Sequence, residues 1–215
     1  MGYRIGKRFF DIIASLVGTA VLLIPWAVIS IIIKILSPGP VLFTPERVGK
    51  DGKSFILYKF RSMQVDSGAI HVTTLRGDPR VFPFGAFLRK SKLDETPQLI
   101  NIIKGEMSVI GPRPEDKVNA DKLYVGKYKE ILSVKPGLSS PASLYDYTHG
   151  ETYLDEALYE KEFEPKKLDV ELYYVKHRSA LYDLQIVWRT VATIIQMAFG
   201  KKDFKEPHEV TLIKE

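Results

Sequence analysis

The most constraining feature of this sequence is an apolar run near its N-terminus. No charged side chain occurs between Ile12 and Ile33, and Lys34 ends the run. About 20 apolar residues in a helix are enough to cross the hydrocarbon core of a bilayer. The run is longer than the apolar part of a secretory signal peptide, and no small-residue cleavage site accompanies it. The sequence therefore predicts a chain seated in a membrane by a helix within residues 1–36.

The path of this helix through the membrane has two readings. Pro25 lies near the middle of the run, where proline removes a helical hydrogen bond and favours a kink. Lys and Arg are enriched on the cytoplasmic flanks of membrane segments. A straight span with a tolerated proline would place one basic flank there, whereas a re-entrant helix broken at Pro25 would place both. The basic residues concerned are Arg4, Lys7 and Arg8 before the run and Lys34, Arg47 and Lys50 after it.

Composition narrows the classes of partner. The 215 residues include 31 Lys and Arg against 26 Asp and Glu, which gives a net charge of +5 and a pI near 9.2. This mild excess suits anionic lipid headgroups or nucleotide phosphates. No motif that reads DNA or RNA accompanies it, so no nucleic-acid partner is expected. The chain contains no cysteine, which excludes disulfides and thiolate metal sites.

Residues with chemical potential concentrate between Lys92 and Pro114. Asp94 and Glu95 are adjacent carboxylates that precede an apolar, helix-like run, and residues 107–110 are predicted to form a short strand or an extended link. Arg113 then stands between two prolines, which fix the backbone on both sides of it. A guanidinium held in this way is suited to a preset site for phosphate or carboxylate.

The spacing of Asp94 and Glu95 limits what the pair can do. Neighbouring helical side chains point about 100° apart, so the two carboxylates cannot face each other across a glycosidic bond. One could act as a nucleophile while the other holds a hard cation, which is an arrangement for phosphoryl transfer. The alternative is that both acids, followed by Pro97, only cap the first turn of a helix.

The wider sequence resembles a known family. Residues 84–115 (FGAFLRKSKLDETPQLINIIKGEMSVIGPRPE) are similar to the core signature of the bacterial sugar transferases, the small monotopic polyprenyl-phosphate phosphoglycosyl transferases. The resemblance covers roughly residues 7–199, in family order. Its other parts are KRFFDIIASLVG near the start, SPGPVLFTPERVGKDGKSFILYKFRSM at 37–63, VKPG at 134–137 and the segment 172–193.

The resemblance implies an enzyme that transfers a phosphosugar from a UDP-sugar to polyprenyl phosphate, with undecaprenyl phosphate as the expected acceptor and UMP as the released product. It implies the re-entrant helix and a place in the bacterial inner (cytoplasmic) membrane, with the active site on the cytoplasmic face. Such a reaction is the first membrane step in the assembly of glycoconjugates such as exopolysaccharide or lipopolysaccharide. Two other classes stay open: a non-catalytic homologue that binds lipid phosphate, and a membrane phosphohydrolase.

The resemblance also implies roles for individual residues. Asp94 is expected to carry the phosphosugar covalently, and Glu95 to hold Mg²⁺. Lys59 and Arg61 alternate with apolar residues and so share one strand face, although a solvated edge is the other reading of that face. The residues expected to bind substrate phosphate are Lys59, Arg89 and Arg113, and those expected near the substrate are Arg61, Arg76 and Arg80.

The predicted fold class is α+β, a small membrane-seated domain. We expect a re-entrant membrane helix in residues 1–36, a catalytic domain in 37–200 and a polar C-terminal tail in 201–215, the last ten residues of it loose. The sequence does not fix the oligomeric state, and a homodimer is one possible assembly.

Patterning within the catalytic region predicts its elements. Residues 41–43 and 54–60 read as two strands of a short hairpin around the Gly49–Gly52 turn. The expected helices are 82–93 and 180–199, the first interfacial and the second either interfacial or part of the core, and a polar helix over 115–132. Residues 138–150 depart from the family pattern and are read as a loop near the nucleotide or sugar.

Overall fold

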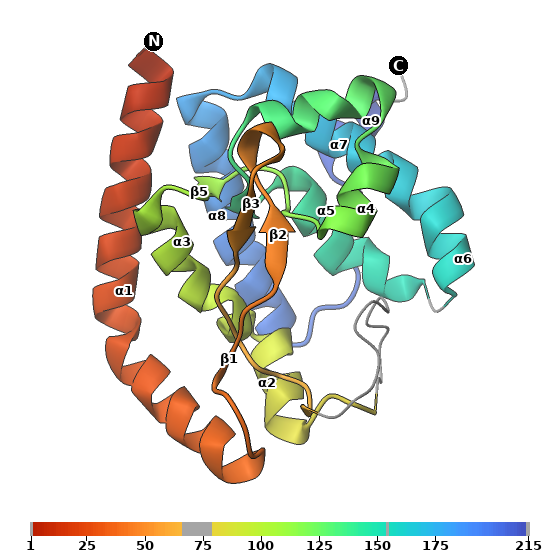
Figure 1. The fold of residues 1–215 in the computed structure, drawn as a ribbon. Helices are drawn as coiled ribbons and strands as arrows, with labels where there is room; N and C mark the ends of the chain where they lie inside the picture. Colours follow the sequence, from red (N-terminus) through yellow and green to blue (C-terminus); the bar gives the residue numbers. More distant parts are fainter. Residues whose placement is uncertain (1, 66–78, 154, 214–215) are drawn as a thin grey trace.

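A computed structural model describes residues 2–65, 79–153 and 155–213. Helix α1 (Gly2–Leu36) runs along one side of the remaining chain in Figure 1, where it is coloured red to orange. It has 35 residues, and its most apolar 18-residue stretch has a mean hydropathy of 2.5, so it is long and apolar enough to cross a membrane. The helix continues through Pro25, and its axis changes direction between its two halves. The predicted kink is thus a bend within one continuous helix, and the re-entrant path stays a prediction.

The remaining helices pack beside α1 around small sheets (Figure 1). The mixed content confirms the predicted combination of helices with a short hairpin. The helical segments are α2 (Pro83–Lys90), η2 (Leu93–Gln98), α3 (Leu99–Lys104), α4 (Lys117–Leu123), η3 (Gly126–Ser133), α5 (Pro141–His149), η4 (Gly150–Thr152), α6 (Glu156–Leu158), η5 (Tyr159–Phe163), α7 (Glu164–His177), α8 (Ala180–Ala198) and α9 (His208–Ile213).

The first half of α1 is fastened to the domain by polar side chains. Arg8 donates to two carbonyl oxygens of the last turn of α3, at 2.6 and 2.9 Å. Asp11 is 2% exposed and accepts hydrogen bonds from Ser108 Oγ at 3.0 Å and from the N–H of Val109 at 2.9 Å. The carbonyl groups in the last turn of α3, which have no partner within the helix, thus accept hydrogen bonds from Arg8. The buried carboxylate of Asp11 has two hydrogen-bond donors.

Asp183 at the start of α8 is a second anchor for α1. Its Oδ2 accepts from Tyr3 Oη and Lys7 Nζ, both at 2.8 Å, and its Oδ1 accepts from Tyr174 Oη at 2.8 Å. Lys7 and Arg8, which the charge pattern placed at the membrane flank, therefore bind the protein. Because these two cations have protein partners, their charges are weaker evidence that this end of α1 lies among lipid headgroups.

The predicted hairpin is confirmed in its turn and return strand. Strands β2 (Glu46–Val48) and β3 (Ser54–Ile56) are antiparallel, and farther from the turn β1 (Leu42–Phe43) pairs with β4 (Lys59–Phe60). Residues 41–43, predicted as the first strand of the hairpin, thus contain β1, which pairs with β4 farther from the turn. The strand next to the turn is β2. The turn holds Asp51 in the left-handed region with φ 57°, which short polar side chains tolerate.

The loop predicted over 138–150 is wrong. Gly137–Ser139 forms strand β6, which pairs in parallel with β5 (Ser108–Ile110), and α5 follows at once. Ser140 caps α5 through its hydroxyl oxygen, and Pro141 occupies the first turn. Serine and proline were read as loop residues, but in this order they begin a helix. Residues 107–110, predicted as a short strand or an extended link, contain strand β5.

Two glycines allow the backbones to cross at the β5–β6 junction. A Cβ atom on Gly137 would lie 2.1 Å from the backbone nitrogen of Gly111. We expect Gly137→Ala to lower the stability of the fold by about 3 kcal/mol or more, because backbone atoms cannot move aside as side chains do. The matched control is Gly6→Ala, where no atom lies within 4 Å of the new Cβ. Thermal unfolding in one detergent compares them, and equal midpoints would contradict the expectation.

The polar helix predicted over 115–132 is two shorter pieces. Tyr124 leaves the helical conformation with φ −87° and ψ 56°, and Gly126 takes a positive φ of 54°. The chain therefore turns between α4 and η3, and a glycine at that point is suited to the positive φ.

The prediction that the last ten residues are loose is wrong for the part that the structure describes, which ends at Ile213. Glu209 on α9 is 3% exposed and accepts from Arg189 Nη1 at 2.5 Å, from Arg189 Nη2 at 3.0 Å and from Tyr182 Oη at 2.7 Å. Val210 is buried beside it in a cluster that includes residues of α5 and α7. A partly buried ion pair and one apolar side chain therefore hold this segment against the domain, although its polar composition is typical of a loose tail.

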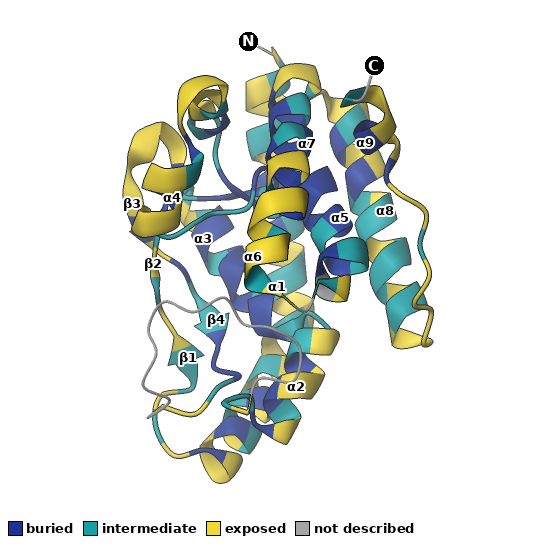
Figure 2. Cartoon of the chain, turned by 90° about the vertical axis from the view of Figure 1, so that its right-hand side faces the viewer, coloured by how far each residue is buried: buried dark blue, intermediate teal, exposed yellow. Residues whose placement is uncertain are grey.

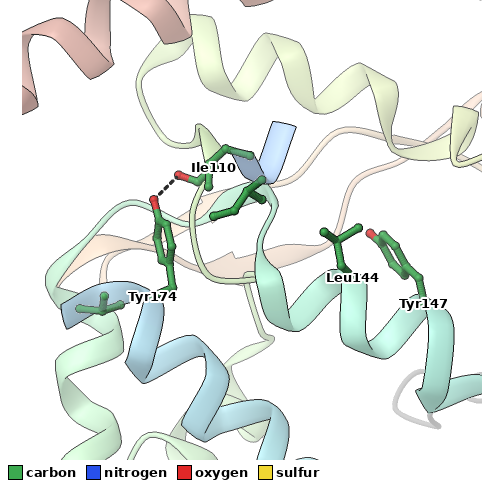
Figure 3. Packing of buried hydrophobic residues seen from close by; sticks show 6 residues of the cluster. Ile110, Leu144, Tyr147 and Tyr174 are labelled. Carbon is green, nitrogen blue, oxygen red and sulfur yellow. Dashed lines mark hydrogen bonds between the residues drawn. The ribbon is translucent and has the colours of Figure 1, made fainter. Parts of the chain in front are cut away.

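The core lies where β5, α5, α7 and α8 meet. Figure 3 shows Ile110, Leu144, Tyr147 and Tyr174 packed together, with Tyr174 Oη donating to the carbonyl oxygen of Ile110 at 3.2 Å. Figure 2 shows that α8, in contrast, is mostly intermediate or exposed. One side of α8 therefore packs in the core through Ile186, while its other side exposes apolar residues, and the interfacial reading stays a prediction. Its exposed apolar side chains are Leu181, Leu184, Trp188, Val191 and Ile195.

Candidate active site

Asp94 is buried in the short helix η2, with 1% of its surface exposed. Its Oδ2 lies 2.8 Å from Lys59 Nζ on β4, which packs against η2. Its Oδ1 is buried and has no hydrogen-bond partner in the described part of the chain. Neither carboxylate oxygen of Asp94 therefore caps a helix among the described residues.

Glu95 lies beside it in a cationic setting. Its Oε1 is 2.9 Å from Arg113 Nη2 and 3.8 Å from Lys59 Nζ, and its Oε2 accepts from Tyr147 Oη at 3.2 Å. Burial alone would raise the pKa of this carboxyl, but the charges of Arg113, Lys59 and Lys92 outweigh burial and hold its pKa well below the usual range. Glu95 is thus ionised, and it too caps no helix.

Arg113 faces the pair from the loop after β5. Its backbone N–H donates to Glu171 Oε1 at 3.0 Å, and its Nη1 donates to Tyr147 Oη at 3.3 Å. The charge of Glu95 raises the pKa of Arg113 above its already high ordinary value. One third of the side chain, 33%, stays exposed. The predicted arginine between prolines thus reaches the predicted carboxylate pair.

The other predicted site residues are placed differently. Arg89 lies in the last turn of α2, and its Nη1 is buried without a hydrogen-bond partner among the described residues. Arg61 is buried and donates to Ser37 and to the carbonyl oxygen of Pro40, at 2.6 Å for the latter. It therefore fastens the turn that leaves α1 rather than facing Asp94 as Lys59 does.

Arg80 and Arg76 are the remaining two arginines that were predicted to lie near the substrate. Arg80 lies just before α2, and its carbonyl oxygen accepts from the N–H of Gln64 at 2.9 Å. Arg76 lies outside the described residues. The roles of all these residues in binding substrate stay predictions.

Sequence reasoning missed Tyr147. It lies in the segment read as a loop, and no local pattern marks a tyrosine there as part of a site. Its ring also carries the ammonium group of Lys92, whose Nζ is 3.6 Å from the ring centroid. Three residues of the site therefore contact one side chain that the sequence did not single out.

Glu171 on α7 was not among the predicted site residues. It is 4% exposed, and its Oε1 accepts from Ser140 Oγ at 3.0 Å and from the N–H of Arg113. Its Oε2 is buried without a partner. Burial outweighs the two hydrogen bonds and raises the pKa of this carboxyl from 4.5 to about 7.

This raised pKa makes stability depend on pH. The folded chain binds the proton of Glu171 more tightly than the unfolded chain, so the resulting stability is complete below pH 4.5 and is lost as pH rises towards about 7. Glu171→Gln keeps an acceptor oxygen without a buried charge. We expect the variant to be more stable than the native protein by on the order of 2–3 kcal/mol at pH 8, with little difference at pH 4.5. Unfolding midpoints at both pH values test this; an equal difference at the two would contradict it.

A divalent cation fits this site only together with other ligands. Among the described residues, no three His, Asp or Glu side chains are grouped to hold a metal. Mg²⁺ commonly takes one or two carboxylates and completes its shell with water and substrate phosphate. Asp94 Oδ1 is unpaired, whereas both Glu95 oxygens have protein partners. The pair suits a cation held largely by substrate, and Glu95 would exchange a protein contact to bind it.

Membership of a family follows from comparison with known proteins. Residues 2–197 match the model of the bacterial sugar transferase family, and the chain belongs to that family. The predicted family is therefore confirmed.

Named relatives are similar along most of this chain. One is the UDP-N-acetylgalactosamine-undecaprenyl-phosphate N-acetylgalactosaminephosphotransferase of Aeromonas hydrophila, 36% identical over 93% of this chain and 46% of that protein. Another is the UDP-glucose:undecaprenyl-phosphate glucose-1-phosphate transferase of Escherichia coli (strain K12), 36% identical over 87% of this chain and 40% of that protein. The exopolysaccharide production protein PSS of Rhizobium leguminosarum bv. phaseoli is 36% identical over 90% of this chain and 97% of that protein. The chain thus spans less than half of the first two relatives and nearly all of the third.

Proposed function

We propose that the protein transfers a phosphosugar from a UDP-sugar to a polyprenyl phosphate, with undecaprenyl phosphate as the acceptor. The names of two relatives describe such transfers. The observation that carries the proposal is Asp94: a buried carboxylate with one oxygen on Lys59 and the other unpaired, next to the Glu95–Arg113 pair. An unpaired oxygen held among cations is suited to attack phosphorus.

The reaction proceeds in two displacements. In the first, Asp94 Oδ1 attacks the β-phosphorus of the UDP-sugar, the bond from that phosphorus to the bridging oxygen breaks, and UMP leaves with the electron pair. In the second, a phosphate oxygen of the lipid attacks the same phosphorus, and the carboxylate of Asp94 is released. The product is a polyprenyl diphosphate sugar. Lys59 orients Asp94, while Arg113 and Arg89 offset charge on the phosphate oxygens.

Mg²⁺ belongs to this proposal as the counterion of the diphosphate, with Glu95 as its protein ligand. When bound there, the cation would neutralise charge on the phosphate oxygens and polarise them. Glu95 is ionised and contributes a hard oxygen donor, which supports the assignment.

The lipid substrate places the site at the membrane. Trp26, next to Pro25 on α1, donates from Nε1 to Thr96 Oγ1 at 2.9 Å, so the apolar helix contacts the segment that carries Asp94. We propose that α1 is re-entrant and that α8 lies in the interface, on the cytoplasmic face of a bacterial inner membrane. A lipid phosphate and a soluble nucleotide sugar could then both reach the site. A homodimer stays a prediction.

The test uses purified protein in nanodiscs with Mg²⁺ and a panel of UDP-sugars, first without lipid acceptor. A burst near one UMP per protein, with a mass increase of one phosphosugar, is the expected result and also names the sugar. UMP release only after undecaprenyl phosphate is added would replace the covalent path by direct transfer. Repeated UMP release without lipid would indicate a phosphohydrolase, and no release under any condition would indicate a non-catalytic homologue.

A further inference from the structure

We propose that Tyr147 is a positioning residue of this site, which holds the guanidinium of Arg113 and the carboxylate of Glu95 in one arrangement. The inference rests on the proposed transferase function, because it gives Tyr147 a part in that reaction. Tyr147 extends from α5 beside Leu144, as Figure 3 shows, and enters the site from a side that neither η2 nor the loop after β5 supplies.

The hydroxyl of Tyr147 closes a ring of three polar contacts. It donates to Glu95 Oε2 at 3.2 Å and accepts from Arg113 Nη1 at 3.3 Å, while Arg113 Nη2 lies 2.9 Å from Glu95 Oε1. A phenol has one proton to donate and lone pairs to accept with, so both contacts are made at once. Each of the two ions is thereby held through two atoms instead of one.

The setting keeps this hydroxyl protonated. Tyr147 is 8% exposed, and burial followed by the negative charge of Glu95 raises its pKa far above the ordinary value of 10.0. Lys92 Nζ lies over the ring of Tyr147, 3.6 Å from the ring centroid. Lys92 has a positive φ of 57° and stands where η2 begins. Tyr147 therefore also contacts the residue from which the Asp94 segment starts.

Arg113 is held at two separate points. Glu171 binds its backbone N–H and also the hydroxyl of Ser140, which caps the start of α5. Tyr147, near the end of the same helix, binds its side chain. Of the five N–H donors of a guanidinium, the described contacts occupy Nη1 and Nη2 once each, and 33% of the side chain is exposed. The exposed donors are then aimed in a fixed direction, as phosphate recognition requires.

The variant that tests this role is Tyr147→Phe, which keeps the ring and removes the hydroxyl. Its matched control is Tyr145→Phe, also on α5, where the lost hydroxyl belongs to a side chain 3% exposed that interacts with Glu206. We expect Tyr147→Phe to lower kcat about tenfold, as for one hydrogen bond to a charged group. The KM for the UDP-sugar should change by less than about twofold, because misaligned donors affect the transition state most. Tyr145→Phe should keep the native kcat.

The assay is steady-state UMP release with undecaprenyl phosphate, together with unfolding midpoints of both variants. A lower kcat in Tyr147→Phe alone, at a midpoint similar to that of Tyr145→Phe, supports the assignment. Equal kcat values in the two variants, or a loss of kcat that follows the unfolding midpoint in both, would reject it. An inactive native protein would reject the transferase function and this role together, whereas an active native protein with a normal Tyr147→Phe variant would reject only the role.

Discussion

The Asp94→Asn variant is expected to fold normally and to lose phosphosugar transfer by at least about a thousandfold. An amide of the same size can still accept from Lys59, but it is a poor nucleophile towards phosphorus. Lys59 also lies 3.8 Å from Glu95, so the substitution leaves no isolated buried charge. UMP release and the mass of the intact protein would both be measured.

The control for this prediction is Asp203→Asn, an exposed acid in the segment between α8 and α9. It changes the same charge by the same chemistry outside the site, so native activity is expected. If Asp94→Asn kept more than about a tenth of the native rate with a normal unfolding midpoint, Asp94 would not be the nucleophile.

Asp183→Ala is expected to be the most destabilising polar substitution among those considered. Its carboxylate is 5% exposed and accepts from Tyr3, Lys7 and Tyr174, each at 2.8 Å. Removing it takes the acceptor from a largely buried ammonium and from the hydroxyl of Tyr3, and leaves Tyr174 with only the carbonyl oxygen of Ile110, a loss of about 3–5 kcal/mol. For a chain of this size the midpoint of thermal unfolding should fall by about 10 °C.

The matched control is Asp121→Ala. Asp121 is 63% exposed at its side chain and pairs only with Lys117 on the same helix, at 2.5 Å. Exposed pairs of this kind contribute about 0.3–0.5 kcal/mol, so its midpoint should barely move. Limited proteolysis adds a second measurement, because losing Asp183 frees the first turns of α1 and should expose new cleavage sites there. Equal midpoints for the two variants would show that Asp183 does not anchor α1.

Local pattern was enough for the apolar helix and for the segment from Asp94 to Arg113. Charge-free length predicts α1, and the apolar run closed by a glycine predicts α3, whose end is Gly105 with φ 88°. Alternation predicted that Lys59 and Arg61 share one strand face, but β4 ends at Phe60, before Arg61. Alternation could not predict that Lys59 contacts Asp94 while Arg61 contacts the turn after α1. Those contacts depend on elements that are distant in the sequence.

The errors share one physical cause, which is pairing across long separations in sequence. Strand β6 exists because Gly137–Ser139 finds β5, and three residues in isolation carry no signal for that partner. Glu209 looks like a solvated tail residue until Arg189 is placed opposite it. Tyr147 was missed for the same reason, because its significance lies in Glu95 and Arg113, which come from other elements.

The anchoring of α1 has a consequence for the order of events during synthesis. Its polar contacts reach residues 94 positions downstream at the end of α3 and 180 positions downstream at Asp183. At about 5–20 residues per second, the ribosome needs roughly 9–36 s to make the intervening chain. Throughout almost all of that interval Tyr3 and Lys7 lack Asp183, and Arg8 lacks its two carbonyl partners for about the first half of it. In the membrane-seated arrangement proposed above, the helix is therefore inserted first, and the nascent domain later folds onto a helix already in place.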